Sequence, residues 1–359
     1  MAPAEREAWL SRCDAEHDNF RAAIEYLVES ANAEWGLRLG SALLWFWEPR
    51  EHLTEGRRWL KALLAIPGAS LLKSQYAPAV YAAGVLADIQ LDFDSHFILM
   101  NTALEMQRQL GNKEGIATLE TALAIGANKA GRFSEARSHI ERALALWKEL
   151  GSSKFVLGLS NLANIAKKQG DYAIARTAYE ATLEAFRSAG DLRGAAVALN
   201  GLGDVAAAQG ALADARRLYE DGLNKFQQIG DPWGIATVLR DLGDLARRSG
   251  DYPEATRFYQ EALTIFHTLG YRRGMAVVLE HLAVCATSDC QPDRALTLAS
   301  AAAVLREKLE ISLSPAEQEE LDQCIQRACE KLPKAEQTKA WAQGRSMTAD
   351  QVLAYVRTG

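Results

Sequence analysis

Apolar residues along most of this chain recur every three or four positions, which is the spacing of one face of an α-helix. Between residues 230 and 250 the apolar positions at this spacing are Ile235, Val238, Leu239, Leu242 and Leu245. The next segment repeats the pattern with Phe258, Tyr259, Ala262, Leu263 and Phe266. Each segment is therefore predicted to form one amphipathic helix with a buried face.

Glycines divide these segments at a regular interval. One series, spaced by 39 or 40 residues, comprises Gly111, Gly151, Gly190, Gly230 and Gly270, and a second series halfway between comprises Gly131, Gly170, Gly210 and Gly250. Glycine suits a helix end because the left-handed backbone that often closes a helix is cheap only for glycine. The aspartate that follows, as in Gly230-Asp231, is suited to cap the next helix. The period predicts five consecutive helix–turn–helix hairpins over residues 111–309.

Small residues recur where the paired helices must approach closely. They are Ala124, Ala163, Gly203, Gly243 and Ala283 in the first helix of each pair, and Ala136, Ala175, Ala215, Ala255 and Ala295 in the second. Three tyrosines follow such an alanine by four residues: Tyr179, Tyr219 and Tyr259. This pattern resembles tetratricopeptide repeats (TPR), in a long variant of about 40 rather than 34 residues. The resemblance implies an all-α, right-handed TPR superhelix (an α-solenoid) of about seven helix pairs.

Four regions are predicted along the chain. Residues 1–30 form an N-terminal helical cap, residues 31–110 form degenerate TPR-like helix pairs, residues 111–309 form the five regular units, and residues 310–359 form C-terminal capping helices. In the second degenerate pair the midpoint glycine is replaced. A new helix is expected to start at Ser314 with Pro315 in its first position. Later breaks are expected at Pro333 and near Gly344.

The two ends of the chain carry a closer resemblance. The stretches WLSRCDAEHDNFRAAIEYLVES and GLRLGSALLWFWEPREHLTEGRRWLKALL, together with the tail LREKLEISLSPAEQEELDQC…AWAQGRSMTADQVLAYV, resemble segments of bacterial STAND-class (AfsR-like) regulatory ATPases. The resemblance implies that the chain is the C-terminal repeat domain of such a regulator. The phosphate-binding motif G-x-x-x-x-G-K-[ST] does not occur, so no nucleotide site is carried over.

Composition and charge narrow the function classes. The chain has 40 basic and 46 acidic residues, for a net charge of −6. This acidic total argues against nucleic-acid binding by this segment. No stretch approaches the roughly 20 apolar residues of a membrane span, and the N-terminus does not resemble a signal peptide. Five cysteines without a C-x-x-C pair are typical of reduced thiols, so we expect a cytoplasmic protein without membrane contact.

Sites for catalysis, cofactors or metals are not predicted. The segment from Gly201 to Ala206 fits a lax G-x-G-x-x-A pattern, but it lies within a predicted helix and follows no strand. The six histidines are scattered and form no H-x-x-x-H or H-E-x-x-H pair. His17, between Glu16 and Asp18, is expected to be solvated. The sequence therefore predicts a non-enzymatic protein that needs no cofactor and has no metal site.

Polar residues on the first helices are the candidate binding residues. By resemblance, the first helix of each TPR pair lines the concave surface, where residues at i, i+4 and i+8 share a stripe. The predicted partner-binding residues are Asn161, Asn164, Lys168, Asn200, Asp204, Arg240, Asp244 and Arg248, with Asp241 and His281 in a flanking column. In peptide-binding TPR proteins, asparagines at such positions hold backbone amides, and Arg or Lys holds carboxylates. Asparagine, with both a donor and an acceptor, suits an extended peptide.

Ordinary surface structure is the alternative for these charges. Arg240, Asp244 and Arg248 have the spacing of an ion-pair ladder along one helix. The dibasic pairs Lys167-Lys168, Arg216-Arg217, Arg247-Arg248 and Arg272-Arg273 either mark an acidic partner or belong to a solvated surface.

Tryptophans gather near the N-terminus. Trp45 and Trp47 are two residues apart, so on a helix they face different ways, one inward and one toward a neighbour or partner. Trp9, Trp35 and Trp59 lie in the same region of sequence. Core packing and an aromatic docking patch for an N-terminal ATPase module both remain open.

The sequence thus predicts a sensor or regulatory module of a bacterial signalling ATPase, which binds a protein or peptide. The first alternative is a free-standing TPR scaffold or peptide-responsive regulator without an ATPase. The second is an enzyme built on an α-solenoid.

Overall fold

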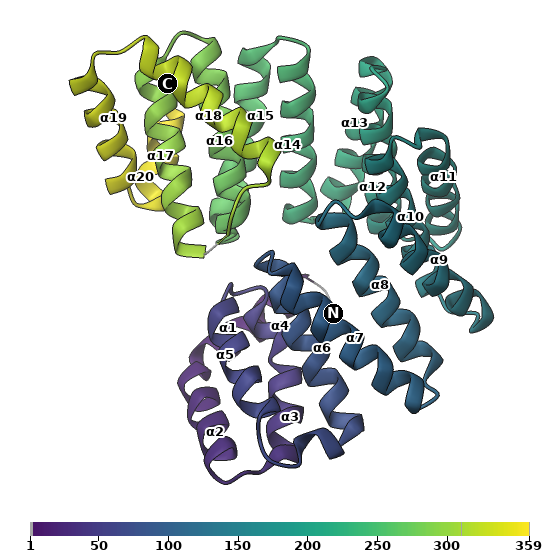
Figure 1. Ribbon diagram of the computed structural model, residues 1–359. Coiled ribbons are helices and arrows are strands. Elements are labelled where there is room, and N and C mark those ends of the chain that lie inside the picture. Colours follow the sequence, from purple (N-terminus) through teal and green to yellow (C-terminus); the bar gives the residue numbers. More distant parts are fainter. Residues whose placement is uncertain (1–2, 310, 359) are drawn as a thin grey trace. The chain divides into compact units, whose positions relative to one another are not determined.

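The computed structural model describes residues 3–309 and 311–358, and in this part of the chain every regular element is a helix (Figure 1). The chain divides into two compact units, residues 1–171 and residues 172–359. The boundary between them falls inside the repeat that begins at Gly151. The region boundary predicted at residue 310 lies outside the described residues.

The first unit contains ten α-helices and one 3₁₀ turn among its described residues. They are α1 (Pro3–Ala15), α2 (His17–Glu29), α3 (Ala33–Ala42), α4 (Leu44–Trp47), α5 (Leu53–Leu64), η1 (Ala69–Leu71), α6 (Lys73–Ile89), α7 (Phe93–Gln109), α8 (Lys113–Lys129), α9 (Phe133–Glu149) and α10 (Lys154–Gln169). Helices α6 and α7, and α8 and α9, pack as consecutive pairs. Two of the predicted hairpins therefore form here, the regular pair α8–α9 and the degenerate pair α6–α7.

The second unit continues the pattern and ends in capping helices. Its elements are α11 (Tyr172–Ser188), α12 (Leu192–Ala208), α13 (Leu212–Ile229), α14 (Pro232–Arg248), α15 (Tyr252–Thr268), α16 (Arg272–Ser288), α17 (Pro292–Leu309), α18 (Pro315–Glu330), α19 (Lys334–Ser346) and α20 (Ala349–Arg357). Helices α12 and α13, α14 and α15, and α16 and α17 pack as pairs. This arrangement confirms the all-α fold of paired helices.

The glycine turns adopt the predicted backbone. All nine glycines of the two series have positive φ, between 58° and 82°. The side chain of Asp231 accepts a hydrogen bond from the amide of Gly234, and Asp251 accepts one from the amide of Glu254. Among the described residues, four turns have this backbone without glycine: φ is 51° at Ala31, 57° at Glu51, 61° at Leu91 and 57° at Cys290.

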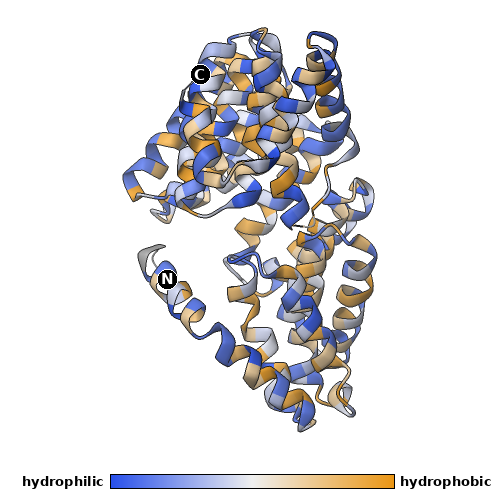
Figure 2. Ribbon diagram, turned by 90° about the vertical axis from the view of Figure 1, so that its left-hand side faces the viewer, coloured by the Kyte–Doolittle hydropathy of each residue, from blue (hydrophilic) through white to orange (hydrophobic). Residues whose placement is uncertain are grey.

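The core forms from the predicted apolar positions. Val238, Leu239, Leu242 and Leu245 are buried, whereas Ile235 is only partly buried. Figure 2 shows apolar residues gathered on the faces along which neighbouring helices pack.

The small residues allow aromatic rings to pack against helix backbones. A Cβ added to Gly243 would lie 2.6 Å from Cε1 of Tyr259, and one added to Gly203 would lie 2.5 Å from Cε1 of Tyr219. In these two repeats the glycine of the first helix is therefore paired with the tyrosine of the second helix.

The two neighbouring tryptophans face opposite ways, as predicted. Trp47 is 1% exposed within the core of the first unit, whereas Trp45 is 65% exposed. Trp9 and Trp59 pack partly buried against the same core, and Trp35 is exposed. Core packing thus accounts for Trp47 and in part for Trp9 and Trp59.

The C-terminal helices begin and end close to the predicted positions. Ser314 caps α18 in a capping box with Glu317, and Pro315 takes the first helical position. The break predicted near Gly344 is confirmed, because α19 ends at Ser346 and α20 begins at Ala349. Gly344 itself lies in the last turn of α19. It is packed so closely on α17 that a Cβ would lie 2.1 Å from the carbonyl oxygen of Thr297. None of the helices in the described residues is both long and apolar enough to cross a bilayer.

Candidate partner-binding surface

Three first helices of the second unit carry most of the predicted binding residues. Helix α12 contributes Asn200 and Asp204, and α14 contributes Arg240, Asp241, Asp244 and Arg248. Helix α16 contributes His281. Helix α14 contacts both α12 and α16, so polar groups from the three helices come together. We call the following seven residues the polar face: Asn200, Asp204, Arg240, Asp241, Asp244, Arg248 and His281.

Asp241 joins α12 to α14. The side-chain amide of Asn200 donates a 2.8 Å hydrogen bond to Oδ2 of Asp241, and Nη2 of Arg240 donates a 2.7 Å hydrogen bond to Oδ1. Burial raises the pKa of Asp241, although the adjacent Arg240 opposes this shift. The other amide atom of Asn200, Oδ1, is buried and accepts no hydrogen bond. The amide is thus oriented by Asp241 with one acceptor unused.

Asp204 and Asp244 are each bound to a tyrosine of their own repeat. The hydroxyl of Tyr219 donates a 2.8 Å hydrogen bond to Oδ1 of Asp204, and the hydroxyl of Tyr259 donates a 2.6 Å hydrogen bond to Oδ1 of Asp244. Nδ1 of His281, on α16, lies 3.0 Å from the same Asp244 oxygen. Burial acts to raise the pKa of Asp244, but His281 and Tyr259 outweigh it and hold the pKa at about 2.

The ion-pair ladder suggested by the sequence is not formed. Arg240 pairs with the adjacent Asp241 rather than with Asp244, and Nη2 of Arg248 donates a 3.0 Å hydrogen bond to the carbonyl oxygen of Ala207 on α12. The ladder is wrong because each arginine takes another partner: the next residue in the chain for Arg240, and a carbonyl oxygen of the neighbouring helix for Arg248. Arg248 therefore joins α14 to α12, whereas Arg240 pairs within α14.

The remaining predicted residues, Asn161, Asn164 and Lys168, lie on α10 in the first unit. The two asparagines are half-buried, and Lys168 is exposed. Lys168 lines a hollow of about 690 Å³ together with Arg132 from the α8–α9 turn and Glu135 from the start of α9. That these three residues share one binding surface with the polar face stays a prediction.

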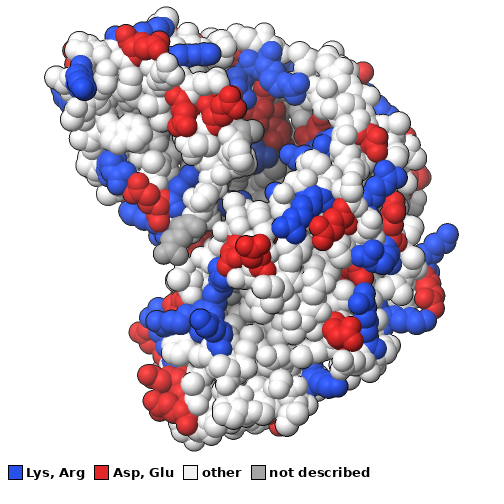
Figure 3. All heavy atoms as spheres, in the orientation of Figure 1, with Lys and Arg blue, Asp and Glu red and all other residues white. Residues whose placement is uncertain are grey.

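One arginine in each of two dibasic pairs is paired with the chain's own acidic residues. Arg216 binds Glu254 at 2.7 Å and Glu220 at 3.0 Å, and Arg247 binds Glu320 at 2.7 Å. On the face shown in Figure 3, basic and acidic side chains are interspersed. This arrangement favours the ordinary-surface interpretation of Arg216 and Arg247.

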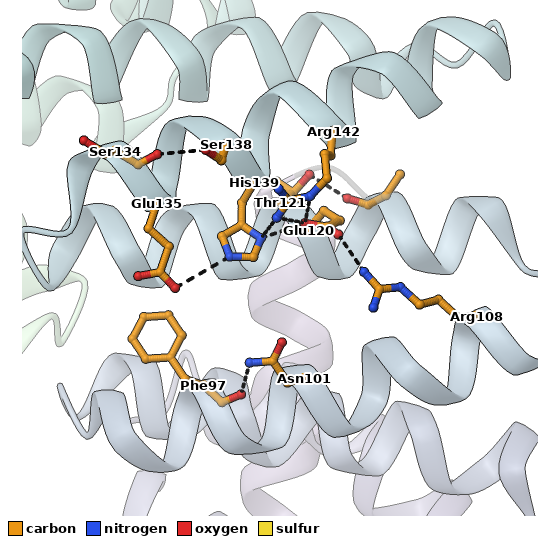
Figure 4. A network of polar contacts seen from close by, with 11 residues as sticks. Phe97, Asn101, Arg108, Glu120, Thr121, Ser134, Glu135, Ser138, His139 and Arg142 are labelled. Carbon is orange, nitrogen blue, oxygen red and sulfur yellow. Dashed lines mark hydrogen bonds and ion pairs between the residues drawn. The ribbon is translucent and has the colours of Figure 1, made fainter.

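One functional group of the first unit, the buried carboxylate of Glu120, was not predicted from the sequence. Glu120 on α8 is 2% exposed, and its oxygens lie 2.6 Å from Nδ1 of His139, 3.0 Å from Arg142 and 3.4 Å from Arg108 (Figure 4). Burial alone would raise the pKa of Glu120, but His139 and Arg142 reverse the shift and lower it. The cluster ties α7, α8 and α9 together.

The alignment of the repeats contained a signal for Glu120. In the register set by the small residues, the equivalent positions are Leu159, Leu199, Leu239 and Leu279. A carboxylate in a column of leucines must be paired when it is buried. The acidic residue at an otherwise apolar repeat position would therefore have allowed this network to be predicted.

A second polar cluster corrects the expectation for His17. Its side chain is 15% exposed rather than solvated, and its ring packs edge-on against Phe46 and beside His52. Burial and the neighbouring His17 lower the pKa of His52. The hydrogen bonds of Arg21 hold the pKa of Glu55, beside His17, at about 2. His17 is covered because α2 packs on α5 and the aromatic segment around Phe46.

Known structures with this fold include a Rap protein and an aspartyl phosphate phosphatase. The Rap protein complexed with competence and sporulation factor is 14% identical, covers 96% of this chain and 99% of its own, and gives a TM-score of 0.58. Aspartyl phosphate phosphatase F from Bacillus subtilis is 13% identical, with coverage of 97% and 96% and a TM-score of 0.58. At these identities the similarity establishes the fold alone.

A STAND protein from Pyrococcus horikoshii, PH0952, has a tetratricopeptide repeat sensor and also resembles this chain. It is 13% identical, with a TM-score of 0.54, and the match covers 96% of this chain and 55% of the STAND protein. None of the curated protein sequences matches. The profile of the MalT-like TPR region matches residues 114–311, more than half of the chain. With its paired helices, glycine turns and buried small residues, the chain belongs to the MalT-like TPR family.

Proposed function

We propose that this chain is a regulatory module that binds a protein or an extended peptide along the polar face of the second unit. The observation that carries the proposal is the convergence of seven polar side chains from three adjacent first helices. Their geometry is already set by mutual hydrogen bonds, so little side-chain freedom is lost on binding. The fold shared with a Rap protein that was crystallised in complex with competence and sporulation factor supports a binding role.

Asn200 is the residue best suited to bind a peptide backbone. Asp241 fixes its Nδ2 atom, and its Oδ1 atom makes no hydrogen bond. A buried acceptor without a partner is unfavourable, so an N–H group of the ligand that reaches Oδ1 gains a hydrogen bond and removes that penalty. Arg240 and Arg248 lie on the next first helix and supply positive charge for acidic groups of the partner.

Selection and titration test this proposal. A displayed peptide library is selected on the wild-type protein, and the affinity of the selected peptide is measured by titration calorimetry. We expect Asn200→Ala to weaken binding by about 1–3 kcal/mol, the scale of a lost buried hydrogen bond. The control Arg216→Ala/Arg217→Ala, on the second helix α13, should bind like the wild type. If the control loses affinity and Asn200→Ala does not, the polar face is not the contact surface.

The extension of the surface to α10 has its own test. Asn164→Ala is added to Asn200→Ala, and the same peptide is titrated. A further loss of affinity without a change in melting temperature supports a surface that includes Asn164. Unchanged affinity restricts the contact to the polar face.

We further propose that the module belongs to a STAND-class ATPase and restrains its switch until the partner binds. The sequence resemblance at both ends of the chain and the fold shared with PH0952 support this context. A reading frame for a Walker-type ATPase continuous with this sequence is the expected observation in the genome. A free-standing gene with no such frame favours the alternative, a peptide-responsive regulator.

The proposed role is non-enzymatic. One neighbour in fold is named a phosphatase, but its 13% identity carries no activity over to this chain. We expect rigorously purified protein to hydrolyse neither acyl phosphates nor nucleotides. Activity that co-purifies with the chain and is lost in an active-site variant would establish the enzyme alternative.

A further inference from the structure

Two histidines and a glutamate meet between α2 and α5 in the first unit. His17 is the first residue of α2, His52 immediately precedes α5, and Glu55 lies in the first turn of α5. One potential ligand atom from each of the three lies within 4.8 Å of the other two, and all three side chains are half-buried. The three residues are separated in sequence by 35 and 3 positions, so no metal-binding spacing marks them.

The distance between His17 and Glu55 already suits a metal ion. Nε2 of His17 lies 3.3 Å from Oε1 of Glu55, and it is buried without a hydrogen bond. Ligand atoms bound to zinc at about 2.0–2.1 Å in a tetrahedron stand about 3.3–3.4 Å apart. Because this nitrogen faces a carboxylate oxygen, its lone pair is favourably placed only when it binds a proton or a metal ion.

An aromatic side chain supports both imidazoles. The ring centroid of Phe46 lies 5.0 Å from that of His17 and 5.4 Å from that of His52, and the two imidazoles are 4.4 Å apart. Phe46 itself is fully buried. The rings are therefore held close together by packing, which limits the rearrangement that a bound ion would require.

We propose that His17, His52 and Glu55 form a binding site for Zn²⁺ or a chemically similar divalent transition metal. Two imidazole nitrogens and one carboxylate oxygen are a donor set that zinc prefers, and a water molecule completes the tetrahedron. The ion would join α2 to α5 and so stabilise the N-terminal end of the first unit.

Arg21 competes with the metal for the carboxylate. Its Nε atom donates a 2.7 Å hydrogen bond to Oε1 of Glu55, and its Nη2 atom donates a 2.8 Å hydrogen bond to Oε2. A metal ion that takes Oε1 must displace one of these hydrogen bonds. Arg21 therefore lowers the metal affinity, and its removal raises the affinity.

The test uses the full chain, freed of metal with a chelator and then dialysed. Titration calorimetry with Zn²⁺ is expected to show one site per chain, and Co²⁺ is expected to give the visible absorption of a tetrahedral complex. His17→Gln and His52→Gln should each lower the affinity by more than about 100-fold, beyond the loss typical of an outer-sphere change. His267→Gln is the matched control, because this half-buried histidine pairs with Asp350 in the second unit, and it should leave the affinity unchanged.

Arg21→Gln separates metal binding from folding. It retains all three ligands, so we expect it to bind Zn²⁺ about tenfold more tightly than the wild type does. Circular dichroism checks that each variant is folded. If the histidine variants unfold, the Zn²⁺ affinity of Arg21→Gln and the Co²⁺ spectrum of the wild type test the site instead.

The proposal is overturned if the wild type has no one-to-one site, or if His17→Gln and His52→Gln fold and bind Zn²⁺ as tightly as the wild type. It is also overturned if Arg21→Gln binds no more tightly than the wild type. No partner is needed, so this test is independent of the proposed peptide binding.

Discussion

The hydroxyl of Tyr259 donates a 2.6 Å hydrogen bond to Oδ1 of Asp244, its neighbour across the α14–α15 hairpin. The preceding repeat contains the same relationship between Tyr219 and Asp204, with the same separation of 15 residues. A buried tyrosine needs a partner for its hydroxyl group, and the first helix supplies it at the same position in both of these repeats. The aspartates of the polar face therefore also hold their own hairpins together.

Tyr259→Phe tests the structural part of this role. The change removes the hydrogen bond and keeps the ring against Gly243, so we expect the free energy of unfolding to fall by about 0.5–2 kcal/mol. Urea unfolding followed by circular dichroism measures it. Tyr26→Phe, at an exposed position, is the matched control and should change stability little. Equal stability of Tyr259→Phe and the wild type would show that the hydrogen bond contributes nothing net.

Asp244 gives the protein an acid-sensitive contribution to stability. Its pKa in the folded protein is about 2, whereas an unfolded aspartate has a pKa of about 3.9. A depressed folded pKa stabilises the protein above the unfolded pKa, and the contribution disappears as the pH falls from about 4 to about 2. At about pH 6 we expect the wild type to exceed Asp244→Asn by on the order of 1–2 kcal/mol.

Unfolding titrations at several pH values measure this contribution. The gap between the wild type and Asp244→Asn should narrow as the pH falls through this window. Asp214→Asn, at an exposed position on α13, should show no comparable pH-dependent gap. A gap that persists unchanged at about pH 2 would contradict the role assigned to the Asp244 charge.

Leu242→Ala probes the apolar column between the hairpins. Leu242 is almost completely buried, so the loss of its side chain leaves a cavity and should lower the free energy of unfolding by about 2–5 kcal/mol. Arg217→Ala, on the exposed side of α13, should cost less than about 0.5 kcal/mol. Because repeats interact mainly with their neighbours, hydrogen exchange should increase most in α12–α17. Similar losses in both variants would mean that the assigned helix faces are wrong.

Cys290→Gly is expected to stabilise the protein. Cys290 is exposed and adopts φ 57°, in a turn where the regular repeats have glycine. The left-handed backbone costs a residue with a Cβ about 1–2 kcal/mol, so glycine should raise the free energy of unfolding by about 1 kcal/mol. Thermal and urea unfolding measure the change. Ser249→Gly, at an ordinary right-handed φ of −81°, should instead be neutral or destabilising, and the same response from both variants would rule out backbone strain as the cause.

The repeat itself could be predicted from the sequence, because its determinants are local or lie at fixed offsets. Glycine is cheap in a left-handed turn wherever it occurs, an aspartate after it caps the next helix, and a small residue opposite a tyrosine recurs with the period. Leu242 and Tyr259 were placed in the core from spacing alone, and both are buried. The similarity of successive repeats turned weak local signals into a prediction of the fold.

The polar contacts were decided by the tertiary structure. Arg240 binds Asp241 instead of Asp244, and Asn200 reaches the same carboxylate from 41 residues away. His17 and His52 meet although 35 residues separate them, because α2 packs on α5. Hydrophobic burial depends on which face of a helix a residue occupies, and this can be read from the period. The choice of a polar partner depends on side-chain directions across neighbouring helices, and only the packed structure sets these.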